Sequence, residues 1–175
     1  MVIRVEFTPL VHRLATQPGM VFKEMVAVLI THELGWSRYG YRFKRVGKGK
    51  ASGRCKHFTI MLTPHFVIAE RFPTFKELRL SVCDRSTNTI YINESRWLRT
   101  VPDRSHLQLP EYRAYLVSHE VGHILGLDHT APSPCSNAER DRFVEAPTMM
   151  QQTLGIGHCM PSPWPKPDEI HRLRY

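Results

Sequence analysis

The chain lacks a long hydrophobic run, an internal repeat and a low-complexity tract. Its longest uninterrupted apolar stretch is MVAVLI, residues 25–30, far short of the ~20 apolar residues that span a membrane. The N-terminal MVIRVEFTPL alternates like a strand and has no long apolar centre, so it is not typical of a signal peptide. With 175 residues, 42% of them hydrophobic, the sequence predicts a single domain over residues 1–175, with a substantial core and no membrane span.

Acidic residues are outnumbered by basic ones, which gives a formal net charge of +8. The only dense basic cluster is RFKRVGKGKASGRCK, residues 42–56, and no nucleic-acid-binding motif accompanies it. We interpret the cluster as a solvated hairpin or loop that could favour an acidic substrate or a cell-surface polymer. The sequence therefore argues against nucleic acid as a partner.

Cysteines are few, and none is spaced as CxxC, which argues against a zinc ribbon. Four cysteines allow three disulfide pairings, and their order along the chain favours Cys55 with Cys83 and Cys135 with Cys159. Four reduced thiols are the alternative. A bridge between Cys135 and Cys159 would contribute about 3 kcal/mol. Because disulfides persist in oxidising compartments, we expect an extracellular or cell-surface location, with an intracellular one as the alternative.

The most informative stretch is HEVGHILGLDH, residues 119–129, which has the pattern HExxHxxGxxH. Its five fixed residue types coincide by chance at a given start with odds on the order of one in ten million, so the pattern is a specific signal. A helix would place His119 and His123, four residues apart, on one face. Gly126 can end that helix in a left-handed conformation, and His129 then approaches from the other side.

Three histidine ligands and a carboxylate favour hydrolytic chemistry at one Zn²⁺ ion. Three imidazoles leave a fourth zinc position for water, which is the open coordination of a catalytic site. Glu120 directly follows His119, so it can take the proton of a zinc-activated water and later pass it to the leaving amine. The alternatives are histidines that serve only as surface or core residues, and a zinc ion that only holds the fold.

The extended motif and the later segment APTMMQQT, residues 146–153, resemble the metzincin clan of zinc metallopeptidases. That clan combines this motif with a methionine-containing turn. The resemblance implies that Met149 forms the floor beneath the imidazoles, with Met150 as the alternative. LGLDHT is similar to matrix metalloproteinases. The pairing of APTMMQQT with a cysteine and a terminal PSPWP looks closer to an uncharacterised metzincin-like domain family of actinobacteria.

Two departures limit what the resemblance implies. Gln151 occupies the position at which astacin-like and serralysin-like members carry a switch tyrosine, so we expect no tyrosine switch. The Pro-x-Tyr segment of matrix metalloproteinases is missing, so their side-chain preferences do not transfer to this chain.

The resemblance implies an α+β, metzincin-like (zincin) fold. Its upper half, about residues 1–126, would hold a twisted mixed sheet and two main helices, and its lower half, about 127–175, would be small and irregular. Hydrophobic patterning predicts a helix over 19–34 and strands over 2–8, 41–46, 57–62, 78–82 and 89–93. The resemblance also implies an edge strand that pairs with an extended peptide. Residues 78–83 are the candidate, with an ordinary edge strand as the alternative.

Together these features predict a monomeric zinc endopeptidase that acts on a peptide or protein. His119, His123 and His129 would bind the metal, and Glu120 would be the general base and acid. Two other functions stay open. The chain could be a zinc-stabilised domain that binds a peptide or surface polymer without cutting it, or a hydrolase of cell-wall peptide cross-links.

Overall fold

A computed structural model describes residues 2–7, 18–46, 56–99, 106–130, 135 and 144–173. The chain forms two compact units, Met1–Arg99 and Thr100–Tyr175. The second unit contains the whole of the HEVGHILGLDH motif. The predicted division into an upper and a lower half near residue 126 stays a prediction.

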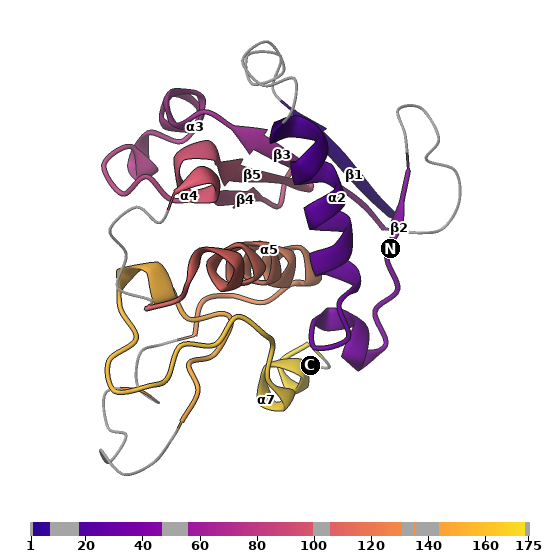
Figure 1. The fold of residues 1–175 in the computed structure, drawn as a ribbon, viewed down its shortest axis with the longest axis vertical. Coiled ribbons are helices and arrows are strands. Elements are labelled where there is room, and N and C mark those ends of the chain that lie inside the picture. Colours follow the sequence, from indigo (N-terminus) through magenta and orange to yellow (C-terminus); the bar gives the residue numbers. More distant parts are fainter. Residues whose placement is uncertain are drawn as a thin grey trace. The chain divides into compact units, whose positions relative to one another are not determined.

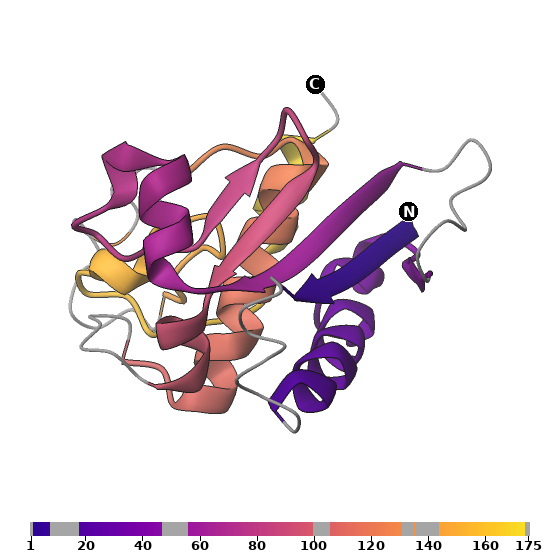
Figure 2. The same ribbon diagram turned by 90° about the horizontal axis from the view of Figure 1, so that it is seen from above.

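The first unit is built on a mixed sheet with five described strands in the order β2-β1-β3-β5-β4 (Figure 1). Four strands run parallel, namely β1 (Val2–Phe7), β2 (Lys44–Arg45), β3 (His57–Thr63) and β5 (Thr89–Asn93). The edge strand β4 (Val82–Asp84) is antiparallel to β5. Successive strands are rotated relative to one another (Figure 2), which is the usual twist of a sheet. The predicted α+β class and mixed sheet are confirmed.

The centre of the sheet is apolar. Along β3 the buried residues alternate with half-buried ones over most of the strand, because successive side chains of a strand point to opposite faces. Ile60 is in register with Ile90 of β5, and Leu62 with Ile92. All four side chains are buried, so β3 and β5 are held together by packing as well as by the backbone ladder.

Helix α2 (Pro18–Thr31) lies beside β1 in the first unit (Figure 1). It buries Phe22, Val26 and Ile30, whose four-residue spacing places them on one helical face. The Phe22 ring meets Trp97 edge to face, with 4.7 Å between the ring centroids. The apolar face of α2 is therefore part of the core of the first unit.

The element boundaries test the sequence predictions. The helix predicted over 19–34 ends at Thr31, and the strand predicted over 41–46 is reduced to Lys44–Arg45. In the first unit, two short helices were not predicted, α3 (His65–Arg71) and α4 (Glu94–Leu98).

The strand predicted over 78–82 begins only at Val82, so the prediction is wrong for its first residues. Arg79 has a φ of 49°, which a strand cannot contain, and its carbonyl accepts hydrogen bonds from Asn93 and Arg96. The edge position that was predicted for residues 78–83 is confirmed for the part that is strand, Val82–Asp84.

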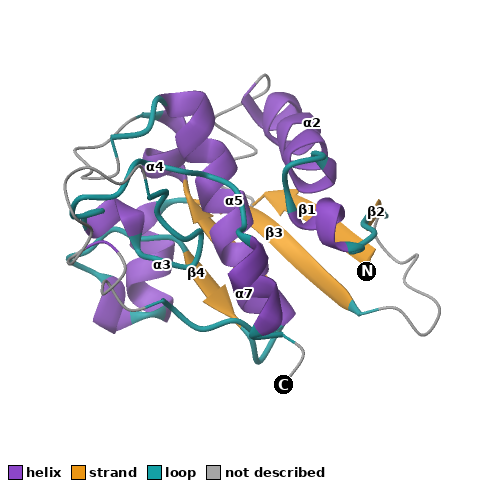
Figure 3. Cartoon of the chain, turned by 90° about the horizontal axis from the view of Figure 1, so that it is seen from below, coloured by secondary structure: helices purple, strands orange, loops and turns teal. Residues whose placement is uncertain are grey.

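The described part of the second unit has little regular structure apart from one long helix, α5 (Leu109–Leu125). It also contains the 3-10 turn η3 (Gln152–Leu154) and the short helix α7 (Pro167–His171). Most of the described chain between α5 and α7 is loop (Figure 3), as expected for residues 127–175. Among the described residues, no helix combines the length and the apolar character needed to cross a membrane.

Candidate metal centre

Helix α5 carries the first two histidines of the motif and ends where the sequence predicted. Its first turn has Pro110 and a capping box between Gln108 and Glu111, both of which favour a helix start. At its other end Gly126 has a φ of 112°, and its N–H bonds to the carbonyls of Gly122 and His123. This left-handed residue turns the chain after the helix, so His129 lies off the helix axis.

The three histidines converge as the motif predicted. One ring nitrogen from each of His119, His123 and His129 lies within 4.8 Å of the others. The Nε2 atoms of His123 and His129 are 3.1 Å apart. Nitrogen ligands bound at about 2.0–2.1 Å to a tetrahedral ion are about 3.3 Å from one another. The three rings are therefore close enough together to hold one metal ion.

Backbone carbonyls fix the orientation of two of these rings. The His119 Nδ1–H donates to the carbonyl oxygen of Thr148 at 2.7 Å. The His123 Nδ1–H donates to the carbonyl oxygen of Leu127 at 2.8 Å. Since a carbonyl can only accept, each Nδ1 carries the proton and the Nε2 lone pair is left for a metal.

Burial changes the protonation of the residues at the site. Desolvation, together with the nearby His123, lowers the pKa of His119 to about 3, so its imidazole is neutral at pH 7 and can act as a ligand. Burial also raises the pKa of the Glu120 carboxyl to about 8. A cation nearby favours the ionised carboxylate, so metal binding and ionisation of Glu120 support each other.

The segment 146–153, which we call the Met-turn, packs against α5 in the second unit. Met149 and Met150 are both buried, but they have different surroundings. Met150 Sδ lies 3.6 Å from Cys135 Sγ, whereas Met149 is linked to the chain after the third histidine through a bond from the Thr130 N–H to its carbonyl. Gln151, which the resemblance aligns with the switch tyrosine, is half-buried.

Two buried tyrosines of α5 also hold the Met-turn. The Tyr115 hydroxyl donates to the Met150 carbonyl and accepts the Gln152 N–H, both at 2.9 Å. Burial raises the pKa of Tyr115, which keeps this hydroxyl protonated. The Tyr112 hydroxyl bonds to the Thr153 hydroxyl at 2.9 Å. Both tyrosines were missed in the sequence, although their spacing places them on the same helical face as His119.

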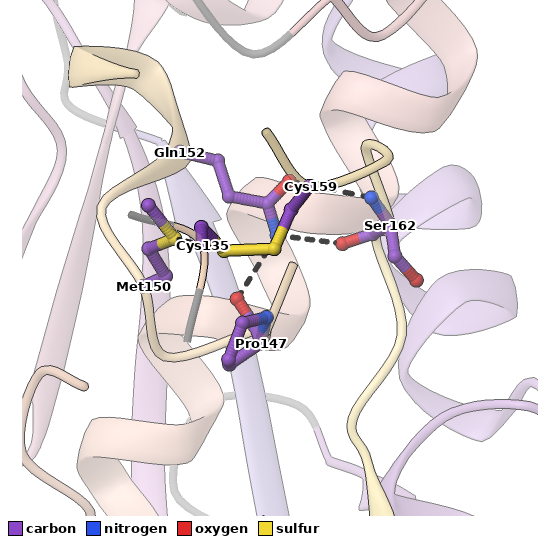
Figure 4. The surroundings of a disulfide bond; sticks show 6 residues. All are labelled: Cys135, Pro147, Met150, Gln152, Cys159 and Ser162. Atoms are coloured by element: carbon purple, nitrogen blue, oxygen red, sulfur yellow. Dashed lines mark hydrogen bonds between the residues drawn. A yellow bond between two sulfur atoms is a disulfide. The ribbon is translucent and has the colours of Figure 1, made fainter. Parts of the chain in front are cut away.

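A disulfide and the buried side chain of Gln152 also hold the Met-turn in place (Figure 4). The predicted bridge between Cys135 and Cys159 is confirmed, with an S–S distance of 2.08 Å. The Gln152 side-chain amide donates to the carbonyls of Pro147 and Ser162 at 3.0 and 2.7 Å. Its oxygen accepts the Ser162 N–H. The Met-turn is thus joined to Ser162 by hydrogen bonds, and the disulfide links the chain before it to the chain after it.

The second predicted bridge is not tested by the structure. Cys55 lies outside the described residues, so the pairing of Cys55 with Cys83 stays a prediction.

A carboxylate from α7 completes the support of the Met-turn. Glu169, 1% exposed, accepts the backbone N–H groups of Thr148, Met149 and Lys166 at 3.1, 2.7 and 2.8 Å. Burial raises its pKa, and these three bonds oppose the rise. This residue was not predicted from the sequence. Its one local signal is the capping box that it forms with Lys166 at the start of α7.

The fold and the site define an α+β protein with a three-histidine cluster that can hold a metal ion. A family model described as "Protein of unknown function (DUF3152)" matches residues 5–167, and the chain belongs to this family. No curated protein and no solved structure matches the chain.

Proposed function

We propose that the protein is a zinc-dependent endopeptidase with a metzincin-like fold, in which His119, His123 and His129 hold one zinc ion. The observation that carries the proposal is the convergence of three imidazole nitrogens within 4.8 Å, two of the rings having Nδ1–H bonded to backbone carbonyls. Three neutral imidazoles without a thiolate are typical of catalytic zinc sites. Glu120, the residue after the first ligand, supplies the acid–base group that hydrolysis needs.

Zinc held by these residues would supply a Lewis acid that makes a water acidic and polarises the scissile carbonyl. Glu120 takes the proton from the attacking water and delivers it to the nitrogen of the leaving amine. Its carboxyl must therefore be ionised at the start of each turnover. Burial alone raises its pKa to about 8, so a cation that favours its charged form would increase the fraction that is competent as a base at neutral pH.

The remaining residues of the second unit hold this chemistry in place. Met149 supports the histidines from the Met-turn, and the buried bridge between Cys135 and Cys159 restrains that turn. The same bridge supports an oxidising location, outside the cell or at its surface. The substrate class of the proposal is a peptide or protein.

A cleavage profile on a diverse peptide library tests the proposal. We expect the zinc-loaded protein to cleave internal peptide bonds, a chelator to abolish cleavage, and added zinc to restore it. Peptide binding without cleavage by the zinc-loaded protein would contradict the proposal and favour a binding domain. Cleavage confined to cell-wall peptide cross-links would keep the hydrolase chemistry and change the substrate.

A further inference from the structure

One peptide group joins α7 to the first histidine of the metal centre. The N–H of Met149 and the C=O of Thr148 belong to the same planar peptide unit. Its N–H donates to Glu169 Oε1 at 2.7 Å, and its C=O accepts the Nδ1–H of His119 at 2.7 Å. Two short hydrogen bonds therefore connect a buried carboxylate to a histidine through a single backbone peptide.

We infer that Glu169 is a positioning residue for the metal site and acts on His119 through the Thr148–Met149 peptide. A negative charge at the N–H end of a peptide polarises it and strengthens its carbonyl as an acceptor. The stronger bond to Nδ1–H fixes the His119 ring and makes Nε2 a better donor to a metal. Carboxylates that bond directly to metal-ligating histidines have this effect, and here a peptide group lies between the two.

The surroundings of Glu169 fit this role better than a purely structural one. A buried carboxylate is costly unless it is well hydrogen-bonded, and capping α7 requires only the bond from the Lys166 N–H. The other two bonds, from Thr148 and Met149, are both made to the Met-turn at the point where it accepts from His119. His123 uses the Leu127 carbonyl instead, so it provides an internal reference that Glu169 does not touch.

Three substitutions separate these roles. Glu169→Gln keeps the shape of the side chain but removes its charge and leaves at least one of the three N–H donors without an acceptor. Glu169→Asp keeps the charge and shortens the reach. Asp168→Asn, at the exposed neighbouring residue, is the matched control because it removes a carboxylate from the same turn of α7.

The readout is the pair of Nδ1–H resonances of His119 and His123 in ¹⁵N-histidine-labelled, zinc-loaded protein. In Glu169→Gln we expect the His119 resonance to move upfield as its hydrogen bond weakens, whereas the His123 resonance stays in place. Glu169→Asp should give a smaller movement, and Asp168→Asn none. Zinc affinity, measured by competition with a chromophoric chelator, should fall about tenfold in Glu169→Gln and stay within twofold of wild type in Asp168→Asn.

Unchanged zinc affinity and an unmoved His119 resonance in a folded Glu169→Gln protein would overturn the inference, as would equal movement of both resonances. If neither Glu169 variant folds, the test uses the wild-type protein. The measurement is then the scalar coupling across the hydrogen bond from the Met149 N–H to the Glu169 carboxylate. Absence of this coupling would overturn the inference. The inference rests on the metal site of the proposed function. Failure of wild type to bind zinc would therefore remove that site, whereas failure to cleave peptides would leave these readouts intact.

Discussion

Different interactions stabilise the two units of the chain. In the first, parallel strands share a backbone ladder, and the centre of the sheet packs apolar side chains such as Ile60 and Ile90. In the second, most of the described chain after α5 is loop, and its interior contains buried polar side chains such as Gln152 and Glu169. The proposed site lies in the second unit, so its geometry depends on a few individual hydrogen bonds and one disulfide.

Replacing Gln152 should lower the free energy of unfolding more than the other substitutions that follow. Gln152→Ala leaves the carbonyls of Pro147 and Ser162 without the donors they have now and also creates a cavity. We expect the free energy of unfolding to fall by about 4 kcal/mol, measured by urea denaturation. Gln151→Ala, at the half-buried neighbour, is the control and should stay within about 0.5 kcal/mol of wild type. Equal effects of the two substitutions would contradict the account.

Removal of the disulfide should destabilise the second unit almost as much. The double variant Cys135→Ala with Cys159→Ala opens a bridge that spans 24 residues, and we expect a loss of about 3 kcal/mol. A wild-type denaturation midpoint in the double variant would show that the bridge does not stabilise the protein. A further drop when reductant is added to the double variant would reveal the bridge between Cys55 and Cys83.

A matched pair of conservative substitutions compares the two units directly. Tyr115→Phe removes both bonds of its hydroxyl to the Met-turn and should cost about 2 kcal/mol and weaken zinc binding. Ile60→Val removes one methylene from the sheet and should cost about 1 kcal/mol without changing the zinc affinity. If Ile60→Val weakens zinc binding as much as Tyr115→Phe does, the site does not depend on individual bonds in the way we describe.

The smallest change in stability should come from a substitution of Asp84, in a surface turn of the first unit. Bonds from the Ser86 hydroxyl, from Thr87 and from Arg71 lower the pKa of Asp84 to about 2, below its usual value of about 3.9. Because the folded pKa is depressed, the contribution of Asp84 to stability is present above about pH 4 and is lost as the pH falls toward 2. Asp84→Asn should lower stability at neutral pH by less than about 1 kcal/mol and remove this part of the acid dependence. A variant that keeps the wild-type acid dependence would contradict the assignment.

Local features of the sequence were predictable where the physical cause is itself local. The helix through His119 and His123 follows from its periodicity and caps, and the turn at Gly126 follows from the conformational freedom of glycine. The bridge between Cys135 and Cys159 agreed with the order of the cysteines. The prediction of a strand from residue 78 was wrong, because the carbonyls of Leu78 and Arg79 accept hydrogen bonds from Arg96. The pattern of residues 78–82 does not contain this contact.

The residues that support the site were not predictable, because they contact residues that are distant in the sequence. Glu169 bonds to residues about twenty positions earlier, and Tyr115 bonds to residues more than thirty positions later. Neither spacing has a periodicity that a sequence pattern could reveal. The residues proposed for chemistry lie within one motif, whereas the residues that position them come from separate parts of the second unit.

Cleavage by the Glu120→Ala variant, measured with its zinc content, tests the central claim most directly. We predict that this protein binds one zinc ion as wild type does and loses peptide hydrolysis, because the ligands are intact and the base is absent. Cleavage at the wild-type rate by the zinc-loaded variant would contradict the claim that Glu120 is the catalytic base.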